Sequence, residues 1–223
     1  MPQPLTIAIA GDVMLGRLVN DVIAQRGHRY PWGDVLPLLQ EADLFLINLE
    51  CALTSHQVPW HNGEYKAFYF RADPTVIETL KAAGVDLACV ANNHSLDFGY
   101  QGLLETLRLL DQAGIGHAGA GPDLASAAAP AVLSAKGYRI GVVAFADYPQ
   151  AWAAMETSPG INYLSVSTDP NEFSPVQAAL KVARAQSDMV IFTIHWGPNM
   201  RVRPSETFKE FARRVMDAGA DVF

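Results

Sequence analysis

Four apolar segments of the sequence each end in side chains that could bind a metal or move a proton. The most distinctive is 89–99, CVANNHSLDFG, in which an apolar run breaks into two amides and an imidazole and then reaches Asp97. The other three segments end at Asp12, at Asn48 with Glu50, and at His195. Carboxylate, amide and imidazole groups together suit borderline-hard metals such as Mn, Fe or Zn. The sequence therefore predicts a metal site.

Each of these polar groups follows a run that reads as a buried β-strand. The apolar runs 5–10, 43–50, 85–91 and 189–195 predict four strands, and amphipathic or capped segments between them predict helices at 16–25, 35–41, 74–83 and 99–113. In an open α/β sheet, ligands bind beyond the carboxyl ends of the strands. We therefore expect the polar strand ends to lie close together.

The remaining segments carry weaker signals. Residues 52–72 are rich in aromatic side chains and predict a strand or hairpin arm near 68–70, which acts either as a substrate-facing flap or as packing on a sheet edge. Residues 131–133 and 139–146 predict an antiparallel hairpin, and 147–173 a long irregular connection. Helices are predicted at 175–186 and after Ser205, and a further strand begins near 220.

Each polar group at a strand end also has an ordinary structural explanation. Asp12 can cap a helix, Asn92 and Asn93 can satisfy turn amides, and a buried histidine is commonly a hydrogen-bonded core residue. Four apolar strands that all end in ligand types make a shared site the better explanation. Within it, we expect Glu50 to bridge metal ions, His94 to act as a general acid, and Asp97 to orient His94.

Composition limits the class of protein. The 223 residues are 50% hydrophobic and 17% charged, which predicts one globular domain, 1–223. The formal charge of −7 argues against non-specific nucleic-acid binding. The sequence contains no apolar run long enough to cross a membrane and no signal peptide, so the cytoplasm is the default location. Cys51 and Cys89 are expected to be reduced thiols.

Five motifs together resemble a known family. GDVMLGR, INLE, ANNHSLDFG, HWGPNMRVRPS and DAGADVF resemble, in this order, the motifs of the bacterial poly-gamma-glutamate capsule-synthesis family, the CapA-like proteins. That family is similar to the calcineurin-like metallophosphoesterases. The resemblance implies an α/β fold that forms a four-layer α-β-β-α sandwich of two mixed sheets.

The resemblance also implies a role for individual residues. Asp12, Glu50, Asn93 and His195 match metal-ligand positions, and His94 matches the catalytic histidine. Met14 stands where the phosphoesterase pattern has a histidine, so one metal position loses a ligand. The family pattern continues beyond DAGADVF with a Gly-His-x-x-His motif. We therefore expect an incomplete C-terminus and a partial or empty metal site here, against two ions in the full-length protein.

The function that the resemblance implies is biosynthesis or processing of poly-gamma-glutamate by a metal-dependent, hydrolase-type site. The alternatives are a non-catalytic binding or assembly component of the same fold, and a phosphoesterase unrelated to capsule. Arg17, Arg201 and Arg203 could attract an anionic polymer, or a small phosphorylated or carboxylated substrate, or they could form a solvated surface. The family also implies membrane-bound capsule machinery as a partner and a location outside the cytoplasm.

Overall fold

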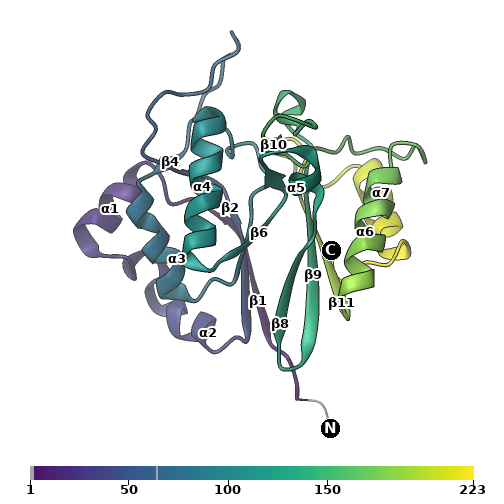
Figure 1. Ribbon diagram of the computed structural model, residues 1–223, viewed down its shortest axis with the longest axis horizontal. Helices are drawn as coiled ribbons and strands as arrows, with labels where there is room; N and C mark the ends of the chain where they lie inside the picture. Colours follow the sequence, from purple (N-terminus) through teal and green to yellow (C-terminus); the bar gives the residue numbers. More distant parts are fainter. Residues whose placement is uncertain (1–2, 64) are drawn as a thin grey trace. The chain divides into compact units, whose positions relative to one another are not determined.

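The computed structural model describes residues 3–63 and 65–223, and the chain divides into two compact units. The first unit is Met1–His117 and the second is Ala118–Phe223 (Figure 1). Each unit is built from its own sheet and helices and is described separately below. Both combine β-strands with α-helices, which confirms the predicted α/β class.

The first unit is built on a four-stranded sheet with the order β1-β2-β5-β6. The strands are β1 (Ile7–Val13), β2 (Leu44–Leu49), β5 (Leu87–Cys89) and β6 (Gly116–Ala118). β1 pairs with β2, and β2 with β5, in parallel. An irregularity in β1 between Ile9 and Asp12 brings Asp12 into register with Asn48. The carboxyl ends of β1 and β2 therefore place their polar residues side by side, as the sequence predicts.

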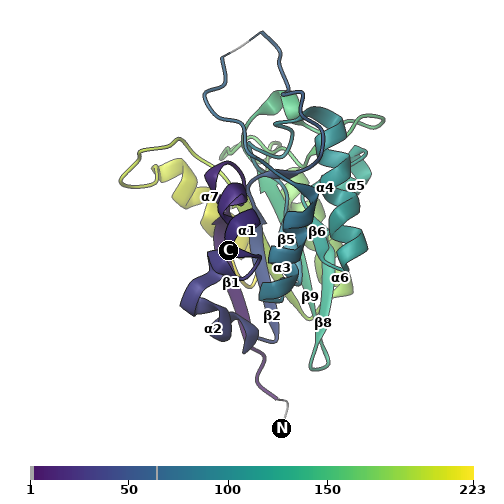
Figure 2. The ribbon, with the colours of Figure 1, turned by 90° about the vertical axis from the view of Figure 1, so that its left-hand side faces the viewer.

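Helices of the first unit follow most of the predicted boundaries (Figure 2). Helix α4 begins and ends where the sequence predicts, and its Leu103, Leu107 and Leu110 are buried. Gly114 ends it in the left-handed conformation that glycine adopts most readily. The helical segments are α1 (Leu18–Arg26), η1 (Tyr30–Val35), α2 (Leu36–Gln40), η2 (Pro74–Val76), α3 (Ile77–Ala83) and α4 (Gly99–Ala113).

The predicted strand or hairpin arm near 68–70 is wrong. Within the described residues, segment 52–72 contains only β3 (Ala52–Leu53) and β4 (Arg71–Ala72), and these two pair in parallel. A hairpin needs its backbone amides for its own ladder. Here they bond elsewhere: the Phe70 amide donates to the Asp97 carboxylate, and the Trp60 amide to the Asp97 carbonyl. Long-range contacts therefore override the local strand pattern.

The second unit has a three-stranded mixed sheet with the order β11-β9-β8. Its strands are β8 (Ala131–Ala135), β9 (Tyr138–Ala146) and β11 (Met189–His195). β8 and β9 form the predicted antiparallel hairpin, and β11 lies parallel to β9. The glycine-rich stretch after residue 114 contributes β6 and β7 (Ala120–Gly121). β7 pairs with β10 (Gly160–Ile161) from the long connection.

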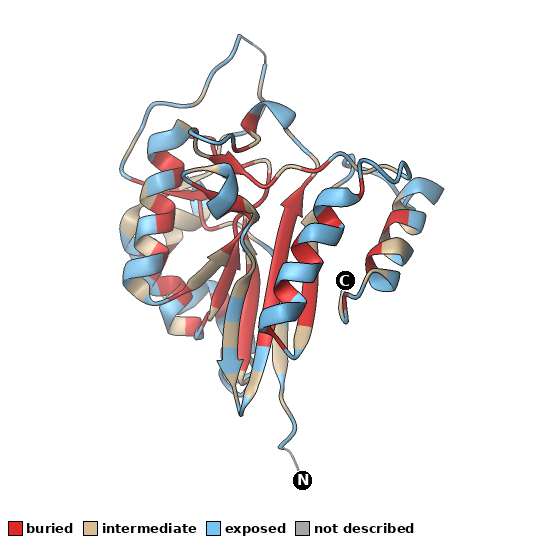
Figure 3. Ribbon diagram, turned by 45° about the vertical axis from the view of Figure 1, so that its right-hand side comes forward, coloured by how far each residue is buried: buried red, intermediate tan, exposed pale blue. Residues whose placement is uncertain are grey.

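The core of the second unit lies between its sheet and its helices. Phe145 of β9, Phe192 of β11, Val176 and Leu180 belong to one buried cluster with Phe211. Figure 3 shows the same pattern as buried strands and as helices that are buried on one side and exposed on the other. The helices are α5 (Leu124–Ala128), the short η3 (Gln150–Trp152), α6 (Ser174–Gln186) and α7 (Glu206–Asp217). Ser205 caps α7 as predicted, by accepting a hydrogen bond from the Phe208 amide.

Other sequence predictions have a different status. The four-layer sandwich and the single domain 1–223 stay predictions. Among the described residues, no helix has the length and apolar character needed to cross a membrane.

The packing of the first unit's core predicts that two leucines of α4 contribute differently to the free energy of unfolding. Leu110 is fully buried (0% exposed), whereas Leu104 is 39% exposed. We expect Leu110→Ala to lower the free energy of unfolding by about 2–5 kcal/mol, because a cavity forms in the core. Leu104→Ala, with the same change of side chain, should lower it by less than about 1 kcal/mol. Urea denaturation of both variants is the measurement, and equal losses would contradict the assigned packing.

Candidate metal and catalytic site

A chain of hydrogen bonds joins the ends of β1 and β2 to the loop after β5. The Asn48 side-chain amide donates to Asp12 Oδ1 at 2.7 Å. The Asn92 amide in turn donates to Asn48 Oδ1 at 3.1 Å and to the Leu49 carbonyl at 2.9 Å. Asn48 therefore orients the Asp12 carboxylate, and Asn92 orients Asn48.

Glu50 brings a second carboxylate to the same place. Its backbone amide donates to the Val13 carbonyl at 3.0 Å, which fixes the residue beside the end of β1. A carboxylate oxygen of Glu50 lies within 4.8 Å of one from Asp12. Asp12 is exposed and Glu50 is half-buried. Two carboxylates at this separation can share a divalent cation.

Residues 90–98 form a tight loop that Asn92 holds. Besides its two donated bonds, Asn92 accepts through Oδ1 from the His94 amide at 3.0 Å. Ser95 Oγ donates to the Val90 carbonyl at 2.6 Å and closes the loop further. Asn92 is fully buried with these partners. Its role is therefore to shape the turn.

His94 and Asp97 form the buried pair that the sequence predicts. His94 Nδ1 lies 2.6 Å from Asp97 Oδ2, and Asp97 is 0% exposed. An ionised carboxylate can only accept hydrogen bonds, so in that form of Asp97 the proton of this bond lies on Nδ1. Nε2 is then the free ring nitrogen, and it lies 3.8 Å from Glu50 Oε1. That separation is too long for a direct hydrogen bond.

Two residues that the sequence reasoning did not select hold this pair in place. The Phe70 ring stacks on the His94 imidazole, with the centroids 3.8 Å apart and an interplanar angle of 23°. The Phe70 amide donates to Asp97 Oδ2 at 2.6 Å, and Lys66 Nζ lies 3.2 Å from Asp97 Oδ1. The aromatic composition of 52–72 suggested that this segment could face a substrate, but it did not indicate which of its residues reach the site.

Asn93 differs from its neighbour Asn92. Its side-chain oxygen, Oδ1, is buried and has no hydrogen-bond partner within residues 3–63 and 65–223. Its backbone carbonyl, in contrast, accepts from Lys66 Nζ at 2.8 Å. A buried acceptor without a donor costs free energy, so it calls for a functional explanation. An oxygen of this kind suits a metal ion.

Cys51 lies beside these carboxylates but is chemically inert. Burial raises the pKa of its thiol to about 12, and the charges of Asp97 and Glu50 act in the same direction. Backbone hydrogen bonds at Leu15 and Gly16 oppose the rise without cancelling it. Its thiol therefore stays protonated at neutral pH, which disfavours a role as a nucleophile. Cys51 and Cys89 are both buried.

Three of the predicted site residues belong to the second unit. His195 ends β11, in register with Ala146, and Arg201 and Arg203 are exposed in the loop before α7. Asp147, which the sequence reasoning did not select, follows β9. Burial raises its pKa, while a hydrogen bond from the Gly197 amide and the charge of His195 partly offset the rise.

Arg17 lies in the first unit, at the start of α1. Its guanidinium stands 5.4 Å from the centroid of the Phe68 ring. Its backbone has a positive φ of 54°, which is uncommon for a residue with a side chain. The preceding Gly16 packs so closely on Arg71 that an added Cβ would lie 2.7 Å from the Arg71 carbonyl oxygen. This close approach fixes where α1 begins.

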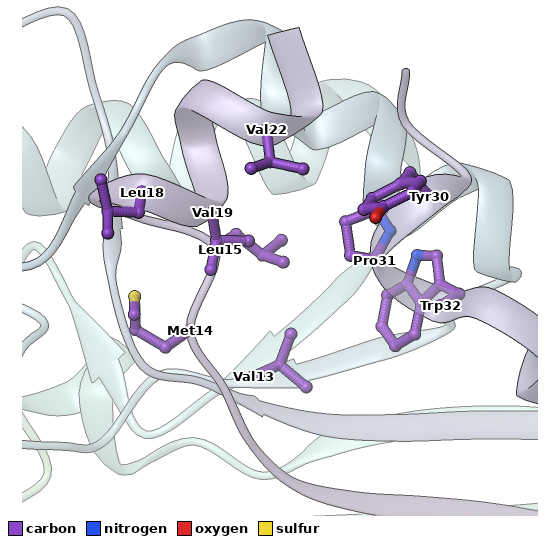
Figure 4. A pocket seen from close by; sticks show the side chains of 9 residues that line it. All are labelled: Val13, Met14, Leu15, Leu18, Val19, Val22, Tyr30, Pro31 and Trp32. Carbon is purple, nitrogen blue, oxygen red and sulfur yellow. The ribbon is translucent and has the colours of Figure 1, made fainter. Parts of the chain in front are cut away.

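The first unit also contains an apolar cavity of about 460 Å³ near the end of β1 (Figure 4). Val13, Leu18, Val22, Tyr30 and Trp32 are among the side chains that line it. The Trp32 indole N–H donates to the Thr79 carbonyl at 2.8 Å and is thereby satisfied. The cavity lining therefore presents almost entirely apolar surface, and none of the predicted site residues belongs to it.

Comparison with known families identifies the chain. The profile of the family described as Bacterial capsule synthesis protein PGA_cap matches residues 6–223, almost the whole sequence. The chain belongs to this family. The resemblance to CapA-like proteins that the five motifs predict is thus confirmed.

Several curated members of the PGA_cap family are similar to this chain. A "Probable polyglutamine synthesis accessory protein" of Mycobacterium tuberculosis H37Rv is 30% identical over 99% of this chain and 67% of its own length. "Capsule biosynthesis protein CapA" of Bacillus anthracis is 27% identical over 99% and 53%, respectively. "PGA biosynthesis protein CapA" of Bacillus subtilis is 28% identical over 98% and 56%. The chain thus spans little more than half the length of the two Bacillus proteins.

Replacing each of the two adjacent asparagines by alanine should affect the free energy of unfolding differently. Asn92→Ala should lower the free energy of unfolding by about 1–3 kcal/mol, because it leaves buried partners unsatisfied. Asn93→Ala removes an oxygen that has no partner among the described residues, and should not lower the free energy of unfolding when metal is absent. Thermal and urea unfolding in the presence of a chelator measure both. A loss for Asn93→Ala as large as for Asn92→Ala would show that Asn93 is a structural residue.

Proposed function

We propose that this chain carries the metal-dependent, hydrolase-type site of a CapA-like protein that acts in the biosynthesis or processing of a capsule polymer. We further propose that its fold is the metallophosphoesterase-like, four-layer sandwich that the motifs imply. The family is established by the sequence match, whereas the chemistry is argued below from the residues of the site.

The observation that carries the proposal is the buried, unpaired oxygen of Asn93. It directly precedes His94, whose Nδ1 is bound to a buried carboxylate and whose Nε2 is oriented toward Glu50. A folded protein rarely leaves a buried acceptor unsatisfied unless a ligand or ion uses it. The position next to a carboxylate-backed histidine favours a metal ion over a structural water.

The available donors fit a divalent ion of the Mn, Fe or Zn type. Asp12 and Glu50 offer carboxylate oxygens within 4.8 Å of one another, and Asn93 offers an amide oxygen. His195 enters the proposed ligand set through its sequence motif. Met14 contributes nothing to it, since its sulfur accepts a hydrogen bond from the Gly16 amide at 3.1 Å and is a soft donor. We therefore propose that this chain holds fewer than two tightly bound ions.

The chain's own residues supply the proton chemistry. A bound divalent ion would polarise the scissile group and lower the pKa of an attacking water. His94, with Nδ1 fixed on Asp97, can in its doubly protonated form give the Nε2 proton to a leaving oxygen and so become the neutral ring. Phe70 covers one face of the imidazole and prevents the ring from rotating out of position. Lys66 and the Phe70 amide hold the Asp97 carboxylate in place.

The substrate is proposed from the family and from the arginines. Relatives carry names that refer to capsule, PGA and polyglutamine synthesis. We propose an anionic polymer, or a small carboxylated or phosphorylated substrate, with Arg17, Arg201 and Arg203 as its binding residues. Guanidinium groups bind carboxylate and phosphate in a two-pronged geometry. Membrane-bound capsule machinery is the proposed partner.

Metal binding tests the proposal directly. We expect the chain to bind Mn²⁺ in isothermal titration calorimetry, with fewer than two tight sites. Asp12→Asn, Glu50→Gln and Asn93→Ala should each weaken binding by about tenfold or more, because each removes a ligand atom. Asp34→Asn removes an exposed carboxylate of η1 and serves as the matched control, with unchanged affinity expected.

Two results would count against the proposal. If all three ligand variants bind Mn²⁺ as tightly as the unmodified chain, the assigned ligand set is wrong. If the ligand variants lose Mn²⁺ but hydrolysis of poly-gamma-glutamate and of phosphoesters by the unmodified chain is absent with Mn²⁺ present, the metal has a structural role. The chain would then be a binding or assembly component.

A further inference from the structure

A second cavity lies in the second unit, between the end of β11 and the start of α7. It has a volume of about 370 Å³ and is formed by the loop 196–205 and the first turn of α7. Figure 1 shows α7 in the final part of the chain. The residues that matter for the following argument are Trp196, Arg201, Arg203 and Phe208, which all line the cavity.

One wall of this cavity is apolar and fixed. The rings of Trp196 and Phe208 meet edge to face, with centroids 4.6 Å apart. Trp196 also contacts Phe211 of the buried core, at 5.7 Å between centroids. The Gly197 amide donates to Asp147 Oδ2 at 2.9 Å, which anchors the loop just after Trp196. The wall is therefore an extension of the hydrophobic core.

The lining of the same cavity also carries two positive charges, those of Arg201 and Arg203. Within the described part of the chain, neither Arg201 nor Arg203 forms a hydrogen bond or ion pair, and both are exposed. Other arginines of the second unit are paired: Arg139 with Asp188, Arg184 with Asp221, and Arg213 with Glu210. Two unpaired guanidinium groups at one cavity stand out in a chain with a formal charge of −7. They favour an anionic ligand.

We propose that this cavity is a subsite for a carboxylate carried on a short aliphatic chain, such as the glutamyl unit of an acidic polymer. The guanidinium groups of Arg201 and Arg203 bind the carboxylate, and Trp196 and Phe208 pack on the methylene groups. Inorganic phosphate satisfies the charge but not the apolar wall, so it binds more weakly. This inference rests on the proposed function for the identity of the polymer. It extends that function by assigning a binding subsite for the polymer to this cavity.

The test measures binding in the absence of metal. A poly-gamma-glutamate oligomer of defined length is titrated into the whole chain in the presence of a chelator, and affinity is followed by tryptophan fluorescence and calorimetry. Arg201→Gln combined with Arg203→Gln should weaken binding by about tenfold or more, since hydrogen bonds to charged groups are lost. Phe208→Leu should weaken oligomer binding while leaving the weaker binding of inorganic phosphate unchanged.

A matched control separates a subsite from general charge attraction. Arg139→Gln combined with Arg213→Gln removes the same charge from the second unit but leaves the cavity intact. Oligomer affinity should then stay within about twofold of the unmodified chain, because distant exposed charges are screened by salt. Circular dichroism verifies that each variant is folded. The proposal is overturned if the control pair weakens binding as much as the cavity pair, or if phosphate binds as tightly as the oligomer.

Failure of this inference differs from failure of the proposed function. Every titration contains chelator and is therefore free of metal. A loss of oligomer affinity in the variant that combines Arg201→Gln with Arg203→Gln thus reports only on the cavity. If Mn²⁺ binds at Asp12, Glu50 and Asn93 but the oligomer does not bind, the cavity proposal falls and the metal site stands. If the oligomer binds and Mn²⁺ does not, the subsite stands and the hydrolase-type site falls.

Discussion

The buried carboxylate of Asp97 is the interaction on which the rest of the site depends. It is fully buried, so it must be surrounded by donors to remain in the interior. The His94 ring and the Phe70 amide bond to Oδ2, and the Lys66 ammonium forms an ion pair with Oδ1 at 3.2 Å. These groups come from two separate parts of the chain. One carboxylate thus sets the orientation of the histidine and also folds an otherwise irregular segment onto it. The same group thus serves the fold and orients the histidine of the proposed site.

The site separates satisfied polar groups from unsatisfied ones. The side chains of Asn48 and Asn92 form hydrogen bonds that orient neighbouring groups. Asn93, one residue further on, keeps a buried oxygen without a donor among the described residues. Such a contrast between adjacent residues of the same type indicates that the loop is built to present one oxygen. The unsatisfied oxygen lowers the stability of the fold at that position, as is common where a ligand binds.

Local patterns in the sequence predicted the elements that local interactions determine. The strand 189–195 and the helix 99–113 match the structure because their apolar residues and terminal signals lie within the segment itself. Residue types at the strand ends also indicated the candidate ligands. The strand or hairpin arm near 68–70 was mispredicted because a contact with Asp97, which is distant in the sequence, determines how Phe70 lies. Lys66 and Phe70 were missed for the same reason, since no spacing in the sequence connects them with His94.

The central claim is that the unpaired oxygen of Asn93 is a metal ligand, and a crystal structure of the Mn²⁺-bound chain tests it most directly. Anomalous scattering locates the ion independently of the protein coordinates. We predict a manganese peak within about 2.0–2.3 Å of Asn93 Oδ1, with carboxylate oxygens of Asp12 and Glu50 at similar distances. A peak remote from Asn93, with its side chain hydrogen-bonded to protein donors instead, would contradict the account.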